Sequence, residues 1–146
     1  IIPEYFSDMS DVNRILGNFK TKYDIGNTAD GCEKTIERSL SRLSRSLGFD
    51  YKKDFRSLLE KICSRISNIQ LSKILNNILI LKKKFGLNNF KIVVSGIGQF
   101  TISKFLKKND IKTLFLKDFL TYSKLNNDAT CHAPALSIAL LLKDLK

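Results

Sequence analysis

Residues 91–99, KIVVSGIGQ, decide the fold class of this chain. The first five form a short, continuous run rich in β-branched side chains, as a buried parallel strand requires. Gly96 and Gly98 provide a turn, and apolar side chains at helical spacing predict a helix over 99–108. A second strand is expected over 112–116. The order strand, glycine turn, helix, strand predicts an α/β architecture with a right-handed crossover.

The residues before this unit carry a helical pattern. Apolar spacing predicts a short helix over 7–17 with Ser7 as its N-cap, a loop over 18–31 and a second helix over 32–47. A long helical region follows over 51–85. Such a length exceeds that of the usual globular helix and predicts a bend or break near 67–72.

The residues after the second strand predict a loop over 117–131 and a last helix over 133–145. Two strands do not make a stable sheet alone, so further partner strands are expected. The chain opens with Ile-Ile-Pro-Glu rather than with Met. We therefore expect the later part of a longer protein. Its predicted parts are a first helix and cleft loop (1–31), a helical segment (32–86) and an α/β subdomain (87–146).

Composition fits one ordinary globular domain: 146 residues, 43% hydrophobic and 27% charged. The net charge of +11 comes mainly from Lys, with 19 Lys against 6 Arg, as expected from an AT-rich genome. Because an excess made of Lys rather than Arg is typical of a solvated surface, a nucleic-acid partner is not favoured. The longest apolar run, 135–142, is too short to span a bilayer. Three widely separated cysteines predict neither a disulfide framework nor a zinc site and fit a reducing cytoplasm.

Gly96, Gly98 and Gln99 form the first candidate site. Glycines after a buried strand let a ligand approach the backbone, and the following helix directs its N–H groups and positive dipole end there. This arrangement suits a phosphate, but a plain strand-to-helix turn explains it equally well. The stretch lacks the third glycine of the dinucleotide fingerprint and the Gly-Lys-Ser/Thr of a P-loop.

Asp30, Gly31 and Lys34 form the second candidate site, within TADGCEKT (28–35). Asp30 is equally well explained as a helix cap. Lys34 in a first helical turn opposes the helix dipole, which indicates an anionic partner.

Four other features have ordinary structural explanations. His132 beside Cys131 is a helix-start residue rather than half of a nucleophilic pair, because no third orienting group is visible. Cys32 and Cys63 are expected to be small, buried or half-buried apolar residues. The basic stripe of the second helix is expected to face solvent; its members are Arg38, Arg42 and Arg45.

Five segments resemble one family in order and spacing. They are TADGCEKT (28–35), RSLSRLSRSLGFD (38–50), IQLSKI (69–74), VVSGIGQF (93–100) and CHAPALSIALLL (131–142). Together they resemble the C-terminal half of a hydantoinase/oxoprolinase-like protein of the tetrahydromethanopterin-linked one-carbon transfer pathway. The family is similar to the archaeal (aminomethyl)furan ether synthases of methanofuran biosynthesis, and the Cys-x-Ala-Pro-Ala ending resembles the bacterial, methylotroph-type members.

The resemblance implies the second lobe of an actin, sugar-kinase and Hsp70-like (ribonuclease H-like) fold. The family's early Asp-Ile-Gly-Gly phosphate motif is not present, and Asp24-Ile25-Gly26-Asn27 echoes it only superficially. In the family, the element matching 91–116 closes over a nucleotide or diphosphate, so Gly96 and Gly98 are expected to contact phosphate or ribose. Asp30, Gly31 and Lys34 match the family's Asp-Gly-x-x-Lys segment near the cleft between the lobes.

The implied chemistry joins an activated aminomethylfuran diphosphate to a phenol, forming an ether and releasing diphosphate. Such a site requires cations, often with a divalent metal such as Mg²⁺, and a base that the sequence does not identify. The implied partners are a small diphosphate, furan or pterin-type molecule, the N-terminal lobe and a second copy of the chain. Alternatives are a hydantoinase/oxoprolinase-type hydrolase and a non-catalytic basic interaction or nucleic-acid-binding module.

Overall fold

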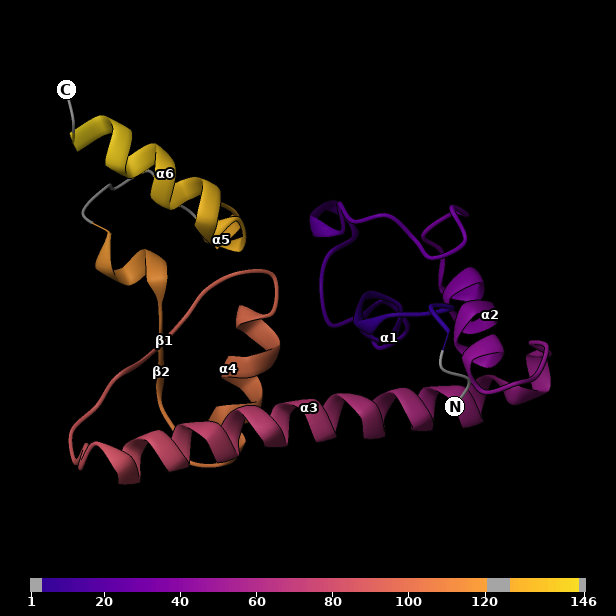
Figure 1. Cartoon of the computed structure of the whole chain (residues 1–146), viewed down its shortest axis with the longest axis horizontal. Coiled ribbons are helices and arrows are strands. Elements are labelled where there is room, and N and C mark those ends of the chain that lie inside the picture. The colour runs from indigo at the N-terminus through magenta and orange to yellow at the C-terminus, as the bar shows by residue number, and fades with distance from the viewer. Residues whose placement is uncertain (1–3, 121–126, 145–146) are drawn as a thin grey trace. The chain divides into compact units, whose positions relative to one another are not determined.

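The computed structural model describes residues 4–120 and 127–144. The chain divides after Ile74 into two compact units, and the long helix α3 (Arg56–Lys84) contributes residues to both of them. The described part of the chain is mostly helical and contains a two-stranded parallel sheet, so the predicted α/β class is confirmed at this level (Figure 1).

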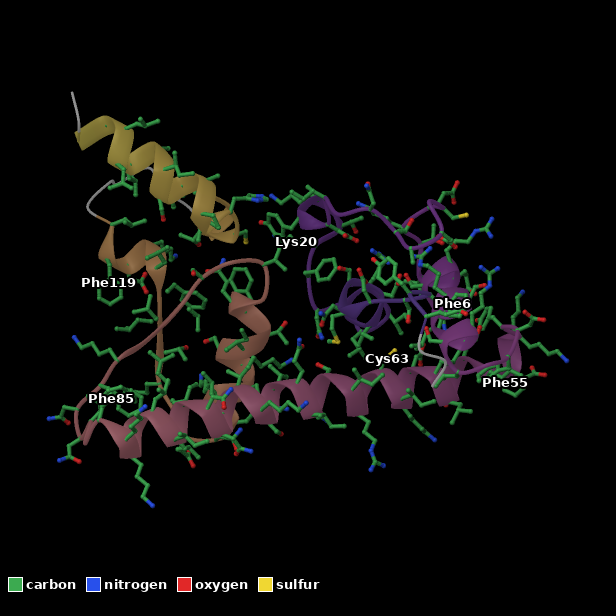
Figure 2. The ribbon with its side chains drawn as sticks, viewed as in Figure 1. Phe6, Lys20, Phe55, Cys63, Phe85 and Phe119 are labelled. Atoms are coloured by element: carbon green, nitrogen blue, oxygen red, sulfur yellow. The ribbon has the colours of Figure 1, made fainter. Side chains whose placement is uncertain are left out.

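The first unit is built from α1 (Met9–Ile15), α2 (Ile36–Ser46) and the beginning of α3, with 3₁₀ turns at Thr21–Tyr23 and Lys53–Phe55. Side chains of the three helices share one apolar core, and Cys63 lies on the face of α3 that α1 and α2 cover (Figure 2). The buried members of this core are Val12, Ile15, Leu40, Leu43, Leu59 and Cys63.

The ends of α1 and α2 differ from the sequence prediction. The N-cap of α1 is Asp8 rather than Ser7, because its carboxylate accepts hydrogen bonds from two backbone N–H groups and forms a capping box with Asp11. The N-cap of α2 is Thr35, so this helix begins four residues later than expected. Ser7 instead makes a 2.8 Å hydroxyl contact with Ser46 at the other end of α2.

The helix α3 runs through 29 residues, and the break predicted near 67–72 is not present. In the first unit its buried side chains recur every four residues, at Leu59, Cys63, Ser67 and Leu71. Of these, Leu59 and Cys63 belong to the core, and this tertiary packing stabilises the beginning of a long helix.

The second unit contains the strand–turn–helix–strand sequence that residues 91–116 predict. The strands β1 (Ile92–Val94) and β2 (Thr113–Phe115) pair in parallel with Val93 opposite Leu114, and α4 (Gln99–Lys108) connects them. Val94 is buried, but Val93 is 45% exposed. Within the described residues β1 is therefore covered on one face only, not on both as expected for a fully buried strand.

The chain continues through a 3₁₀ turn (Leu116–Phe119), a short helix α5 (Asn127–Cys131) and α6 (Ala133–Asp144). Part of the predicted loop, 121–126, and the predicted last helical residue, Leu145, lie outside the described residues. Three large apolar side chains of α6 are exposed, at Ile138, Leu141 and Leu142. In the described ranges, no helix combines the length and apolarity that a membrane span needs.

Replacing Leu40 with Ala tests the core of the first unit. Leu40 is fully buried between α1 and α3 side chains, so its loss should lower the free energy of unfolding by about 2–5 kcal/mol. Leu58→Ala is the matched control, because Leu58 is half exposed on α3 and should cost roughly 0.5 kcal/mol or less. Urea unfolding followed by circular dichroism measures both values. Equal losses in the two variants would contradict this core.

Candidate functional site

The first unit contains a buried network of ion pairs around Arg42. Although Arg42 belongs to the stripe expected to face solvent, its side chain is only 1% exposed. Its Nε and Nη2 lie 2.9 and 2.7 Å from Asp11 Oδ1, and its Nη1 lies 3.0 Å from Asp30 Oδ1. Arg38 and Arg45 are exposed as predicted. The expectation for Arg42 is wrong because a carboxylate of α1 covers the polar face of α2 at that point.

Arg14 extends the network from α1 to the loop before α2. Its Nη1 donates to Asp11 Oδ1 at 2.7 Å and to Ser39 Oγ at 2.6 Å. Its Nε lies 3.0 Å from Asp24 Oδ2, and its Nη2 contacts the same oxygen. The side chains of Asp11 and Asp24 are only 3% and 4% exposed, and such charges are tolerated inside a protein only when paired and hydrogen-bonded.

Two of the three residues of the second candidate site, Asp30 and Lys34, join this network at its exposed edge. Asp30 accepts a hydrogen bond from the Cys32 N–H at 3.1 Å in addition to its pair with Arg42. Lys34 Nζ donates to the Asp24 carbonyl oxygen and lies 3.8 Å from Asp24 Oδ1. The side chains of Asp30 and Lys34 are 23% and 30% exposed, so solvent reaches both.

These contacts change two interpretations of the sequence. Asp30 stabilises the turn at Gly31, whose φ is +67°, but it does not cap α2. Lys34 has an anionic partner in its own chain, Asp24, which explains its place before a helix without a ligand. The role of Asp30, Gly31 and Lys34 in substrate binding stays a prediction.

Opposing effects set the pKa of Asp30. Burial alone would raise the pKa, but the Cys32 N–H and the Arg42 guanidinium stabilise the carboxylate and hold its pKa below the usual value. For Arg42, burial alone would lower the pKa. The hydrogen bonds and the negative charge of Asp11 outweigh this effect, so the pKa of Arg42 is raised. Both shifts favour the charged pair.

The first candidate site lies in the second unit, between β1 and α4. Gly96 has a φ of +81°, and its N–H donates to the Thr130 carbonyl oxygen at 2.8 Å. The Gln99 N–H donates to the Gly96 carbonyl oxygen at 3.1 Å. Two backbone donors of this turn are therefore engaged inside the protein. Phosphate binding by the turn stays a prediction, and it requires backbone N–H groups other than those of Gly96 and Gln99.

Gln99 connects this turn to α5. Its side chain is fully buried, its Nε2 donates to Cys131 Sγ at 3.2 Å, and its Oε1 accepts from Thr130 Oγ1 at 3.1 Å. The structure thus brings Gln99 of the first candidate site together with Cys131, thirty-two positions later. Cys131 is buried whereas His132 is exposed, which is not the arrangement of a nucleophile and its base.

The other two cysteines differ from each other. Cys63 is buried as expected, and burial raises the pKa of its thiol to about 11. Cys32 is exposed, so its expected burial is wrong. It lies in the exposed turn after Asp30, to which its N–H donates. Within the described residues, no three His, Cys, Asp or Glu side chains group to hold a metal ion.

Replacing Arg42 with Met tests the network. Because the change leaves Asp11 buried with fewer partners, the free energy of unfolding should fall by about 3 kcal/mol. Arg45→Met removes an exposed guanidinium from the same helix and should change it by about 0.5 kcal/mol or less. Chemical denaturation measures both. A loss for Arg42→Met no greater than for the control would contradict the network.

Replacing Asp30 with Asn tests the pKa. Since the folded-state pKa is lowered, the carboxylate stabilises the protein above its usual pKa of about 4, and this contribution is lost as the pH falls through the lower folded value. The variant should therefore melt below the parent at neutral pH, and the difference in Tm should shrink on acidification. Asp54→Asn, which removes an exposed carboxylate outside the network, is expected to follow the parent curve. A constant difference in Tm for Asp30→Asn would refute the shift.

Comparison with curated proteins identifies two relatives that share one name. A search of protein-family models finds no match. The chain is 28% identical to each of two curated proteins named (4-{4-[2-(gamma-L-glutamylamino)ethyl]phenoxymethyl}furan-2-yl)methanamine synthase, from Methanococcus vannielii and Methanocaldococcus jannaschii. The alignments cover 97% and 96% of this chain but only 62% and 40% of the relatives. The similarity supports, at this low identity, the link to (aminomethyl)furan ether synthases of methanofuran biosynthesis.

Proposed function

We propose that this protein acts in methanofuran biosynthesis, as part of an enzyme that joins an activated aminomethylfuran diphosphate to a phenol. The observation that carries the proposal is the similarity to the two synthases, which extends over nearly the whole chain. The chain spans about three-fifths and two-fifths of their lengths, so the activity is proposed for the complete product of the gene.

The proposed reaction is a substitution at carbon. The bond between the furan-bound CH₂ and the diphosphate oxygen breaks, and a bond forms between that carbon and the phenol oxygen. Diphosphate leaves with the electron pair, and the phenol proton passes to a base. Negative charge develops on the leaving oxygen, so cations and backbone N–H groups directed at it lower the barrier.

The charge of the second unit supports a diphosphate ligand. Residues 75–146 contain twelve Lys, no Arg, four Asp and no Glu, which gives +8 of the net charge of +11. Such an excess attracts polyanions over about a Debye length, roughly 8–10 Å in physiological salt. Within this unit, the Gly96–Gly98 turn at the N-terminus of α4 is the proposed position for the phosphates.

The proposal assigns Asp30, Gly31 and Lys34 to substrate binding in the first unit. Their support is partial exposure combined with fixed geometry, because Arg42 and Asp24 hold the two charged side chains in place. A divalent ion such as Mg²⁺ is proposed only as a companion of the diphosphate. No residue is proposed as the base.

The proposal also includes an N-terminal lobe that completes an actin/sugar-kinase/Hsp70-like fold. It further includes association of the chain with a second copy of itself. The apolar side chains exposed on α6 support a partner surface of this kind. Bacterial, methylotroph-type membership of the hydantoinase/oxoprolinase-like family rests on the sequence resemblance alone.

The test is phenol-dependent release of diphosphate by the complete gene product. The substrates are (aminomethyl)furanmethyl diphosphate and γ-glutamyltyramine, and mass spectrometry detects the ether. Hydantoin and 5-oxoproline are offered in parallel, and binding to random DNA is measured across salt concentrations. Ether formation supports the proposal. Hydrolysis of the hydantoin or oxoproline ring would instead indicate the hydrolase. Steeply salt-dependent DNA binding without turnover would indicate the nucleic-acid-binding module.

Gly98→Ala tests the glycine turn more cleanly than a change at Gly96, where a positive φ strains any side chain. Gly98 has a φ of −81°, and an added Cβ would lie 3.6 Å from Ile102 Cδ1, an ordinary contact. If phosphate approaches this backbone, the variant should fold normally while diphosphate release falls about tenfold or more. Gly26→Ala, whose Cβ meets no atom within 4 Å, is the control. Unchanged turnover in Gly98→Ala would remove the turn from the site.

A further inference from the structure

A pocket of about 280 Å³ opens in the first unit among α1, α2 and α3. Its apolar lining comes from all three helices and consists of Met9, Val12, Leu43, Leu47 and Ile66. This volume lies just below that of typical small-molecule sites, about 300–1,000 Å³, and suits a single ring with a short substituent. None of the residues that line it is one of the charged residues of the Arg42 network.

The polar part of the lining is acidic. The described residues that line it include Glu4, Asp8 and the hydroxyl residues Ser7 and Ser46, but no Lys, Arg or His. In a chain with 25 basic and 14 acidic side chains, a pocket with two acids and no base is a local reversal of charge. The charge therefore favours a cationic ligand and disfavours an anionic one.

Both acids have acceptor capacity left. Among the described residues, the Glu4 side chain forms no hydrogen bond or ion pair. Asp8 Oδ1 accepts from the Ser10 and Asp11 N–H groups at 2.8 and 3.1 Å, and Oδ2 accepts from the Tyr5 hydroxyl at 3.3 Å. Because a carboxylate offers about four lone-pair sites, Asp8 can accept one further donor while it caps α1.

We infer that this pocket binds a small aromatic or heteroaromatic ring that carries a primary ammonium group. The ring lies against the apolar side chains, and the three N–H donors of the ammonium meet Glu4 and Asp8. A furan ring with an aminomethyl group has this chemistry. Its identification with the amine end of the substrate rests on the proposed function, whereas the pocket's preference for aryl-methylammonium compounds does not.

The binding test uses furan-2-ylmethanamine as the probe and the 146-residue chain labelled with ¹⁵N. Amide shifts in a titration are expected at Val12, Leu43 and Leu47, with a dissociation constant of roughly millimolar size for so small a ligand. Furan-2-ylmethanol retains the ring without the charge, and methylammonium retains the charge without the ring. Each is expected to bind at least about tenfold more weakly.

Two variants locate the ammonium. Glu4→Gln and Asp8→Asn remove the charges while Asn still caps α1, so the fold should be retained, as the dispersion of the amide spectrum will show. The double variant should weaken binding of the amine about tenfold and leave that of the alcohol unchanged. Asp54→Asn, which removes an exposed acid outside the pocket, should bind the amine as the parent does.

Equal binding of amine and alcohol, or unchanged amine affinity in the double variant, would overturn this inference. So would the absence of shifts at the pocket up to about 20 mM amine, well beyond the expected range. The outcome is separable from the proposed function, because binding is measured without turnover. Charge-dependent amine binding without ether formation would refute only the function; ether formation with an unaltered KM in the double variant would refute only the pocket.

Discussion

The buried contact between Arg42 and Asp11 is the constraint on which the first unit depends. Removing two charges from water costs several kcal/mol for each ion, and only close pairing with further hydrogen bonds offsets this cost. Arg42 meets the requirement through Asp11 of α1 and Asp30 of the loop before α2. The apolar core around Leu40 stabilises the unit, but apolar contacts have no preferred direction. The guanidinium, in contrast, donates good hydrogen bonds only to carboxylates that lie in its plane. The network therefore fixes how α1, α2 and the loop are oriented within this unit.

Local sequence signals predicted α4 and the two strands of the second unit well, but the expected loop over 117–131 is wrong where the 3₁₀ turn (Leu116–Phe119) and α5 form. The bounds of α4 and the two strands follow from β-branched runs, glycines and helical periodicity, all of which act over a few residues. The start of α2 was harder to predict, because Asp30 and Thr35 are both good capping residues and only the hydrogen bond to the Arg38 N–H decides between them. The actin-like fold stays a prediction, since a two-stranded sheet within the described residues is common to many α/β arrangements.

The network could not be predicted from periodicity. Arg42 lies on the polar side of α2, and a helix pattern alone makes such a residue look solvated. Its burial follows from Asp11, thirty-one positions earlier. One signal was present, since Asp11 and Arg14 form an i,i+3 pair in a helix too short to be stable alone. The same limit applies to Gly96. Its conformational freedom can be inferred from the sequence, but the hydrogen bond from its N–H to the Thr130 carbonyl oxygen cannot.

Charge links the two proposals physically. A substrate with a diphosphate at one end and an ammonium at the other is drawn toward a protein of net charge +11 through its anionic end, and that attraction acts at a distance. The same field repels the ammonium, so random Lys-rich surface cannot orient such a molecule. Orientation requires a local reversal of charge in which carboxylates contact the ammonium directly, because contact pairs outweigh screened distant charges. Glu4 and Asp8 provide this reversal beside an apolar wall.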